Sequence, residues 1–314
     1  MPLKLDDIVS IIRENIARKG NPIGIDPEVC SSWARDLGIP RESDTIIYTS
    51  CMYQSVPYLI ELVNMLERLE KGPRIFTSLG VMLAKTIDVA SIAGKRGADM
   101  ERFNNMIRNI VLALRKQGLN IGYLYEEEPY SGSLLYELGL EDDFTVHAKK
   151  VFSLFKERGV KKIIAIDPHT YYILSKVYPK YIDGYDIQVI HYIEALDPSK
   201  LGKISGEAPN IVIHDPCLLA RFSRIVEPQR NLLKSIGVNV KEPHRSGLRT
   251  RCCGGPIEAL SPTLSRRIGE QRVEELSRLE RNIVVMCPIC FSNISRLAEK
   301  YGAKVMDLSE FIHQ

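Results

Sequence analysis

Five of the seven cysteines in this 314-residue chain lie in its last third. They follow the pattern C-x34-C-C-x33-C-x2-C, which is filled by Cys217, Cys252, Cys253, Cys287 and Cys290. A thioredoxin-like redox pair needs only two cysteines, and structural zinc takes four ligands, usually from two paired knuckles. Iron–sulfur clusters readily accept sites rich in thiolates. The spacing therefore favours an iron–sulfur cluster, with zinc and redox or inert thiols as alternatives.

Short apolar segments that resemble β-strands come directly before these cysteines. The segment IVIHDPC ends at Cys217, and NIVVMC ends at Cys287. Open α/β sheets build their sites at the carboxyl ends of parallel strands, so both sulfurs are expected at one sheet edge. The CCGG turn at 252–255 can reach the same edge, because glycine lets the backbone approach closely.

A weak internal repeat relates the two halves of the chain. The matching segments, given in pairs, are 161–181 with 281–302, 46–51 with 211–217, and 129–139 with 252–261. Each half alternates strand-like and helix-like segments, which is typical of α/β folds with largely parallel sheets. We therefore expect two pseudo-symmetric, Rossmann-like α/β halves that arose by internal duplication.

Three segments are expected along the chain. They are a helical N-terminal segment at 1–45, a degenerate half at 46–200 and an intact, cluster-binding half at 201–314. The first half also contains an extra helical block at about 76–117. This block has an apolar part at 79–93 and an amphipathic part, and it could contact a partner subunit or a membrane surface, although packing inside the domain is the simpler interpretation.

Proline marks the expected starts of two helices. One is expected from Pro57 to Lys71, with the proline in its first turn. Ser261 and Pro262 indicate the start of a second helix. The apolar residues of this second helix recur on roughly one face, at Leu264, Ile268, Leu276 and Leu279.

The composition is that of a globular protein without a nucleic-acid function. The 42 basic and 39 acidic residues give a net charge of only +3, whereas nucleic-acid-binding domains normally carry a strong basic excess. No segment of the sequence is long and apolar enough for a transmembrane helix, and the acidic N-terminus does not fit a signal peptide. We expect a cytoplasmic protein with reduced thiols, where metal or redox chemistry is favoured over disulfides.

Three motifs carry a resemblance to a known family. The segments HDPCLLAR, RCCGGP and CPICFSNI resemble the cysteine-rich CCG domain of heterodisulfide reductase B and D subunits. The same domain occurs in the iron–sulfur subunits of glycolate, lactate and glycerol-3-phosphate dehydrogenases. The segment at 14–40 is also similar to the part that follows the ferredoxin module in longer D-type members. The resemblance implies a non-cubane [4Fe-4S] cluster held by all five cysteines of the motif.

The first half departs from the family pattern. Only Cys51 remains of its five cysteine positions. Tyr130 and Ser131 stand where the adjacent cysteines would be, and Asp167 and Thr170 replace the CxxC pair. The resemblance therefore implies a cluster in the second half alone. The sequence also lacks the CxxCxxCxxxCP motif of ferredoxin modules, so electrons are expected to be exchanged with a separate flavoprotein or ferredoxin-like subunit.

Three residues of the first half are candidates for a site opposite the cluster, because they follow matching strand ends. They are Cys51, Asp167 and His169. In a substrate site, Cys51 would act as a redox thiol, or His169 would donate a proton to a leaving thiolate. A second metal such as zinc, held by all three, and a vestigial half kept for its shape are the alternatives.

We expect an iron–sulfur redox subunit of a heterodisulfide-reductase-like or flavin-dependent dehydrogenase complex. It would move electrons between a partner subunit and a thiol, a disulfide such as lipoate, or another acceptor. A pure electron-transfer subunit and a zinc-stabilised scaffold are the alternatives, and partners could place the chain at the periphery of a membrane.

Several further residues have two interpretations each. His214 could form hydrogen bonds near the cluster sulfurs or serve a structural role. Arg221, Arg224 and Arg230 could line the approach to the cluster or be solvated surface residues. Cys30 is expected to be a small core residue rather than a ligand.

Overall fold

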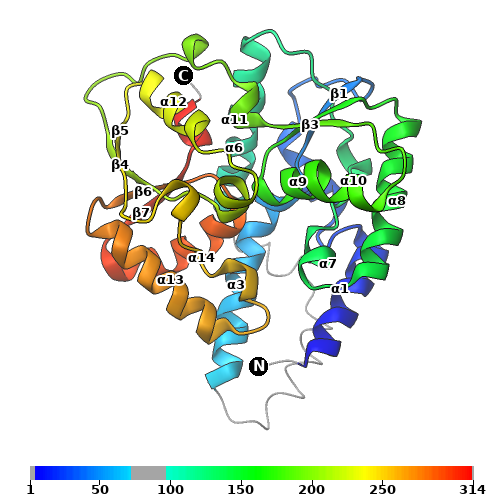
Figure 1. Cartoon of the computed structure of the whole chain (residues 1–314), viewed down its shortest axis with the longest axis horizontal. Coiled ribbons are helices and arrows are strands. Elements are labelled where there is room, and N and C mark those ends of the chain that lie inside the picture. Colours follow the sequence, from blue (N-terminus) through cyan, green and yellow to red (C-terminus); the bar gives the residue numbers. More distant parts are fainter. Residues whose placement is uncertain (1–3, 72–96, 313–314) are drawn as a thin grey trace.

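The computed structural model describes residues 4–71 and 97–312. Figure 1 shows two α/β halves side by side, with α3 (Met52–Lys71) running along the junction between them. In the described residues, seven parallel strands form two sheets. The predicted α/β class is therefore confirmed. Every helix within residues 4–71 and 97–312 is too short or too polar to span a membrane.

The first sheet has the strand order β1-β2-β3. Its strands are β1 (Thr45–Tyr48), β2 (Lys162–Ala165) and β3 (Gln188–His191). Ile164 in the central strand pairs with Ile47 on one side and Ile190 on the other. A parallel bridge from Ile46 to Gly122 extends the sheet beyond β1. The helices of this half are α7 (Ser133–Glu137), α8 (Glu141–Glu157), α9 (Pro168–Tyr172), α10 (Tyr178–Tyr181) and α11 (Tyr192–Ala195).

The second sheet has the strand order β5-β4-β6-β7. Its strands are β4 (Asn210–Ile213), β5 (Asn239–Lys241), β6 (Asn282–Val285) and β7 (Lys304–Asp307). Its helices are α12 (Glu227–Ser235), α13 (Pro262–Ser277), α14 (Pro288–Ala298) and α15 (Ser309–Ile312). Three short helical turns lie near the cysteines, at η5 (Leu218–Phe222), η6 (Gly247–Arg249) and η7 (Gly255–Ile257).

The two sheets place equivalent chain segments in equivalent positions. The order from the Gly122 bridge through β1 and β2 to β3 matches the order from β5 through β4 and β6 to β7. Cys51 and Cys217 both follow the second position in this order, and Asp167 and Cys287 both follow the third. This arrangement agrees with the repeat, while the duplication itself stays a prediction.

The N-terminal segment is helical and is bonded to the first half. It contains α1 (Leu5–Lys19) and α2 (Pro27–Cys30). The last residue of α2, Cys30, forms a disulfide with Cys51. Cys30 is buried in a small core cluster, as predicted, whereas its bond to Cys51 was not predicted.

Helix α3 ties the halves together and begins earlier than the sequence predicted. It starts at Met52, directly after Cys51, so Pro57 lies inside the helix rather than in its first turn. Near its other end, the buried Glu67 carboxylate accepts hydrogen bonds from Arg266 on α13 and Arg296 on α14. The side chains of Tyr53 and Val56 are fully buried, and this packing stabilises helix before the proline.

Helix α6 (Gly97–Lys116) forms the described part of the extra helical block. Its side chains at Met106, Ile107, Ile110, Val111 and Leu114 are fully buried. It also packs against α15, and Asn109 Nδ2 donates to the Ser309 carbonyl at 3.1 Å. These contacts support internal packing for this helix. The apolar part at 79–93 lies outside the described residues.

Helix α13 begins at Pro262 as predicted, but a different face packs inward. Leu264 and Leu279 are exposed. The buried face instead carries Ser265, Gly269, Arg272, Val273 and Leu276. The reason is close helix packing: a Cβ at position 269 would lie 2.5 Å from a Leu297 methyl on α14, so the small residue marks the contact face.

Candidate metal centre and adjoining cavity

The five cysteines of the second half come together at the carboxyl edge of its sheet. Cys217 follows β4, and Cys287 follows β6 as the residue before α14, which carries Cys290 in its first turn. Cys252 and Cys253 lie between η6 and η7. The side chains lie within hydrogen-bonding contact in the order Cys217, Cys252, Cys253, Cys290, Cys287. Three sulfurs are buried, whereas those of Cys217 and Cys252 are half-buried.

Backbone groups position the adjacent cysteines. Gly254 has a φ of 88°, and a Cβ there would lie 2.6 Å from a backbone oxygen of α13, so only glycine fits. The amides of Gly254 and Gly255 point at the sulfurs of Cys252 and Cys253, at 3.3 and 3.4 Å. Asn293 Nδ2 donates to the Cys253 carbonyl at 2.6 Å. These donors orient the sulfurs and stabilise negative charge on them.

A buried carboxylate anchors the loop that leads to this turn. Asp215 accepts two hydrogen bonds from the Arg230 guanidinium, both at 2.9 Å, and one from the Gly247 amide at 2.7 Å. Thr250 Oγ1 donates to the Asp215 carbonyl at 2.8 Å. Arg230 also pairs with Glu242. Of the two interpretations of Arg230, neither describes it fully, because it is half-buried and holds Asp215 rather than lining the approach to the sulfurs.

His214 lies beside the sulfurs and is held neutral. One of its ring nitrogens and the sulfurs of Cys253 and Cys290 lie within 4.8 Å of one another. Nδ1 accepts a hydrogen bond from Arg272 Nε at 3.0 Å. Burial lowers the pKa of His214 to about 3, and the positive charge of Arg272 acts in the same direction. The position fits the expected role of a hydrogen-bonding neighbour of the cluster sulfurs.

The donor chemistry fits an iron–sulfur cluster. Crowded thiols cannot all ionise, because each thiolate disfavours the next. Hydrogen bonding to Cys252 raises the pKa of Cys253, and hydrogen bonding to Cys253 raises that of Cys290. The pKa of Cys287 is instead lowered to about 5: burial opposes its ionisation, but hydrogen bonds from Cys290 and His169 outweigh it. Bound iron ions would resolve this conflict by letting all five bind as thiolates.

The equivalent turn of the first half is filled by hydroxyl groups. The Tyr130 hydroxyl lies 2.7 Å from Ser133 Oγ and accepts from the Leu134 amide at 2.7 Å. The Ser131 amide donates to Ser50 Oγ at 2.8 Å. These residues satisfy one another's hydrogen bonds, so this turn offers hydroxyl groups where the second half offers thiols.

His169 joins the first half to the metal centre. Asp167 Oδ1 accepts from the amides of His169 and Thr170 at 2.9 and 3.0 Å and so caps α9. The buried His169 ring places Nδ1 2.7 Å from Glu137 Oε1 and also contacts the Cys287 sulfur. Burial opposes protonation, but the neighbouring Glu137 carboxylate and Cys287 sulfur raise the pKa of His169.

Cys51 is not a free thiol in this structure, because it is bonded to Cys30. Asp167 directs one carboxylate oxygen at the start of α9, while His169 turns to Glu137 and Cys287. A metal site made of Cys51, Asp167 and His169 would therefore require the disulfide to be reduced first.

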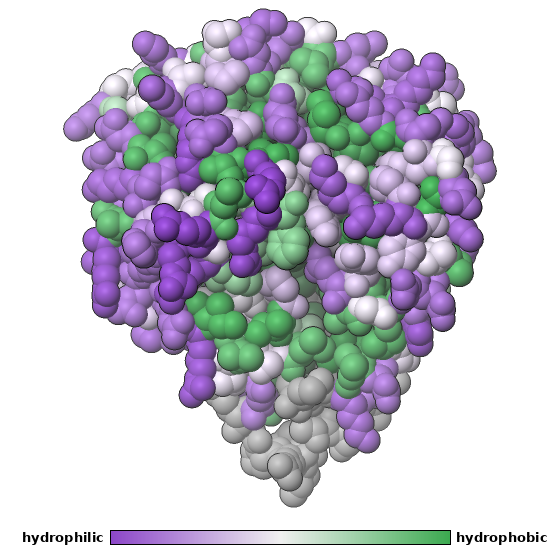
Figure 2. Space-filling view, viewed as in Figure 1, coloured by the Kyte–Doolittle hydropathy of each residue, from purple (hydrophilic) through white to green (hydrophobic). Residues whose placement is uncertain are grey.

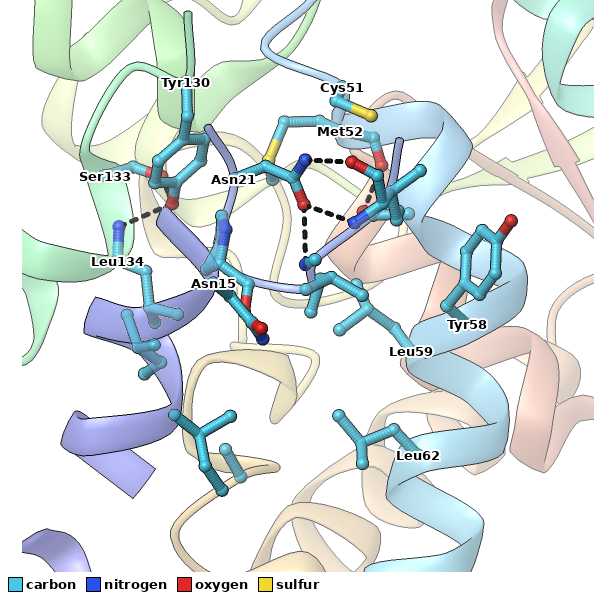
Figure 3. A pocket seen from close by; sticks show the side chains of 18 of the residues that line it. Asn15, Asn21, Cys51, Met52, Tyr58, Leu59, Leu62, Tyr130, Ser133 and Leu134 are labelled. Atoms are coloured by element: carbon cyan, nitrogen blue, oxygen red, sulfur yellow. Dashed lines mark hydrogen bonds between the residues drawn. The ribbon is translucent and has the colours of Figure 1, made fainter. Parts of the chain in front are cut away.

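A cavity of about 350 Å³ opens between the N-terminal segment, α3 and the metal centre. Its walls are mainly apolar, and they include Ile8, Ile12, Leu59, Leu62, Leu66 and Leu134. Figure 3 shows Leu59 and Leu62 facing the cavity from α3, opposite α1, with Cys51 and Tyr130 at the far end. Protonatable side chains also line it, namely those of Glu137, His169 and Glu258. In Figure 2, hydrophobic side chains stand on either side of a hollow in the lower part of the visible face.

Glu258 was missed by the sequence reasoning. It is 6% exposed, and its Oε2 has no hydrogen-bond partner in the described structure. Burial raises the pKa of this carboxyl to about 8, while Arg296 and His169 act in the opposite direction. Near neutral pH it is therefore mainly protonated and able to donate. The available signal was its place in RCCGGPIE, directly after the cysteine turn.

Comparison with known proteins agrees with this geometry. Residues 211–295 match the family model CCG, described as a cysteine-rich domain. These residues therefore form a CCG cysteine-rich domain, as the three cysteine motifs predicted.

The relatives of the chain are iron–sulfur and redox proteins. It is 26% identical to a probable membrane-anchored ferredoxin of Chromohalobacter salexigens over 95% of this chain and 41% of that protein. It is 31% identical to the probable iron-sulfur-binding oxidoreductase FadF of Bacillus subtilis over 63% of this chain and 29% of that protein. It is 29% identical to an EtfAB:quinone oxidoreductase of Syntrophomonas wolfei over 77% of this chain and 36% of that protein. The chain thus spans less than half the length of these relatives.

Proposed function

We propose that this chain is an iron–sulfur redox subunit that passes electrons between a partner subunit and an acceptor bound in the cavity. The observation that carries the proposal is that the same side chains separate the cysteines from the cavity. His169, Pro256 and Ile289 enclose the cysteines and also line the cavity. An acceptor in the cavity would therefore be separated from the cluster by a single layer of side chains.

The residues divide the work between holding the cluster and supplying protons. The five cysteines would hold a non-cubane [4Fe-4S] cluster, which supplies single electrons when bound. His169 and Glu258 are placed to donate protons to the acceptor, and the mainly apolar walls suit the hydrocarbon part of an organic molecule. The chain would belong to a heterodisulfide-reductase-like or flavin-dependent dehydrogenase complex.

The acceptor is proposed to be an organic disulfide, of which lipoate is one type. A cavity of about 350 Å³ has the size of a small-molecule site. The first half offers no second set of thiolates in its described residues, so a leaving thiolate would need a proton rather than a second cluster. Protonated Glu258, and His169 beside it in the wall, meet that need.

The proposed architecture is a duplicated pair of halves at 46–200 and 201–314, preceded by the N-terminal segment at 1–45. The shared strand order of the two sheets supports the duplication. It also explains why the degenerate half retains a site-like turn without thiols.

The partner subunit is proposed to dock over the two half-buried cysteines. The turns η5 and η6 pack together beside Cys217 and Cys252, and they expose Phe222 and Leu248. Three exposed arginines lie in or just after these turns and form no ion pair within the described residues, namely Arg221, Arg224 and Arg249. Figure 2 shows hydrophobic and strongly hydrophilic side chains interleaved near the middle of the visible face. The surface suits an acidic electron-carrier protein.

Charge reversal at this surface should slow electron entry. A small acidic ferredoxin serves as the electron donor. At low salt it is expected to reduce the cluster of the double variant Arg221→Glu/Arg224→Glu at least about tenfold more slowly than that of the wild type. The difference should shrink as salt screens the charges. Stopped-flow absorbance measures the rate. The matched variant Lys149→Glu/Lys150→Glu on α8 should behave like the wild type, and equal slowing in both would contradict this docking surface.

Metal analysis of anaerobically prepared protein tests the proposed function directly. We expect iron and inorganic sulfide, with a paramagnetic signal after one-electron oxidation or reduction. Zinc without iron in fully loaded protein would instead support the scaffold alternative. Iron with no reduction of an organic disulfide, even with an electron donor present, would support the pure electron-transfer alternative.

A further inference from the structure

We propose that the Cys30–Cys51 disulfide is a redox-active pair that takes up two electrons from the cluster side of the cavity. This inference deepens the proposed function, because it names the group that receives electrons before the acceptor does. The pair joins the end of α2 to the start of α3 and lies 21 residues apart in sequence.

The place of Cys51 in the fold supports this role. Cys51 follows β1 as Cys217 follows β4, so it occupies the strand end where the second half places a cluster ligand. Cys51 also lines the cavity that Gly255 and Ile289 line from the cluster side. Figure 3 shows the Cys51 side chain at one end of this cavity, beside the start of α3.

The backbone at Cys51 adopts an unusual conformation that hydrogen bonds to Glu128 stabilise. Ser50 and Cys51 have φ values of 54° and 56°, in the left-handed region that side chains other than glycine disfavour. The Glu128 carboxyl group holds this conformation by accepting from the Thr49 amide at 2.7 Å and the Ser50 amide at 2.9 Å. Because these hydrogen bonds do not involve sulfur, the turn can keep its shape when the disulfide opens. Strained conformations retained in this way cluster at functional sites.

The chemical setting of the chain also argues against a purely structural bond. The five cysteines near the cavity must stay reduced to bind a cluster, so the protein matures where thiols are kept reduced. In such surroundings disulfides are usually catalytic or redox-sensing. The chain also has an extensive buried core, so the stability of its fold does not depend on a disulfide as that of small domains does.

The proposed step balances in electrons and protons. Two single electrons, delivered in turn by the partner subunit through the cluster, cleave the S–S bond, and two protons convert the sulfurs to thiols. Glu258 and water entering the cavity are the proton sources. The dithiol then transfers both electrons and both protons to an organic disulfide in the cavity. That reaction converts the organic disulfide into two thiol groups, which stay in one molecule when the disulfide is cyclic as in lipoamide, and re-forms the Cys30–Cys51 bond.

The test measures the thiol state of the two residues in the full chain. Cluster-loaded protein is reduced anaerobically with dithionite, quenched in acid and alkylated, and peptide mass spectrometry reports labelling of Cys30 and Cys51. Both are expected to be labelled as the cluster is reduced, and to lose labelling after oxidised lipoamide is added. In Cys253→Ser, labelling should be at least about tenfold slower, because the intramolecular route is lost.

Two results would overturn the proposal: a disulfide that stays intact while the cluster is fully reduced, and equal labelling rates with and without the cluster. Wild-type protein without cluster provides a second measurement in glutathione buffers of graded ratio. The pair is expected to be half-reduced within that range, and a bond that survives the most reducing buffer argues against it. If no iron binds at all, the proposed function fails, yet this second measurement still decides whether the pair is reducible.

Discussion

Replacing Cys253 with serine is expected to abolish stable cluster binding. Cys253 is buried, contacts both Cys252 and Cys290, and has its carbonyl fixed by Asn293, so its sulfur lies at the centre of the five. A serine oxygen is a poor ligand for iron in a thiolate site. We expect retained iron to fall by at least about tenfold, since loss of even an outer-shell partner can cost that much. Iron and sulfide analysis after gel filtration measures it.

Cys30→Ser is the matched control, because it removes another buried cysteine that lies outside the five. It should retain iron at the wild-type level. If both variants lose iron equally, the loss reflects general destabilisation rather than a ligand. If Cys253→Ser keeps its full iron content, Cys253 is not a ligand and the proposed set of five is wrong.

Replacing His169 with alanine is expected to lower turnover by about a hundredfold while the cluster stays in place, since a positioned proton donor typically contributes this much or more. His169 contacts Cys287 but supplies no ligand of its own in the proposed set. The expected change is in kcat, with KM for the organic disulfide nearly unchanged. Steady-state kinetics with paramagnetic resonance on the same preparation separates turnover from cluster content.

Asn293→Asp provides a comparison for a residue that acts on the cysteine turn instead. It should alter the cluster signal itself, because it removes the donor to the Cys253 carbonyl. If His169→Ala keeps wild-type kcat, proton delivery does not run through His169. If it loses the cluster signal, its role is to orient Cys287.

The convergence of the five cysteines could be predicted from the sequence because the signals are local. Cys217 and Cys287 each end a short apolar run, and parallel strands bring such ends to one edge. The glycines after Cys252 and Cys253 likewise predict a tight turn, which the positive φ of Gly254 confirms.

The cavity and the disulfide could not be predicted, because they depend on long-range packing. The 21-residue separation of Cys30 and Cys51 carries no spacing signal, and their pairing depends on how the N-terminal segment folds back onto α3. Glu258 faces the cavity only because α1 and α3 leave space in front of it. Neither of the two interpretations of Arg230 included its buried partner Asp215, which is fifteen residues away in sequence.

The buried Glu67 on α3 bears on whether the two halves of the chain can move relative to each other. Its ion pairs with Arg266 and Arg296, together with a hydrophobic core that runs from the first sheet into the second, make the halves one cooperative body. The exposed link near residue 200 is then not a hinge. Two fragments produced by proteolytic cleavage of this link would remain associated, because the contacts that hold the halves together do not involve the link. Access to the cysteines therefore does not depend on separation of the halves, because Cys217 and Cys252 are already half-buried while the halves are joined.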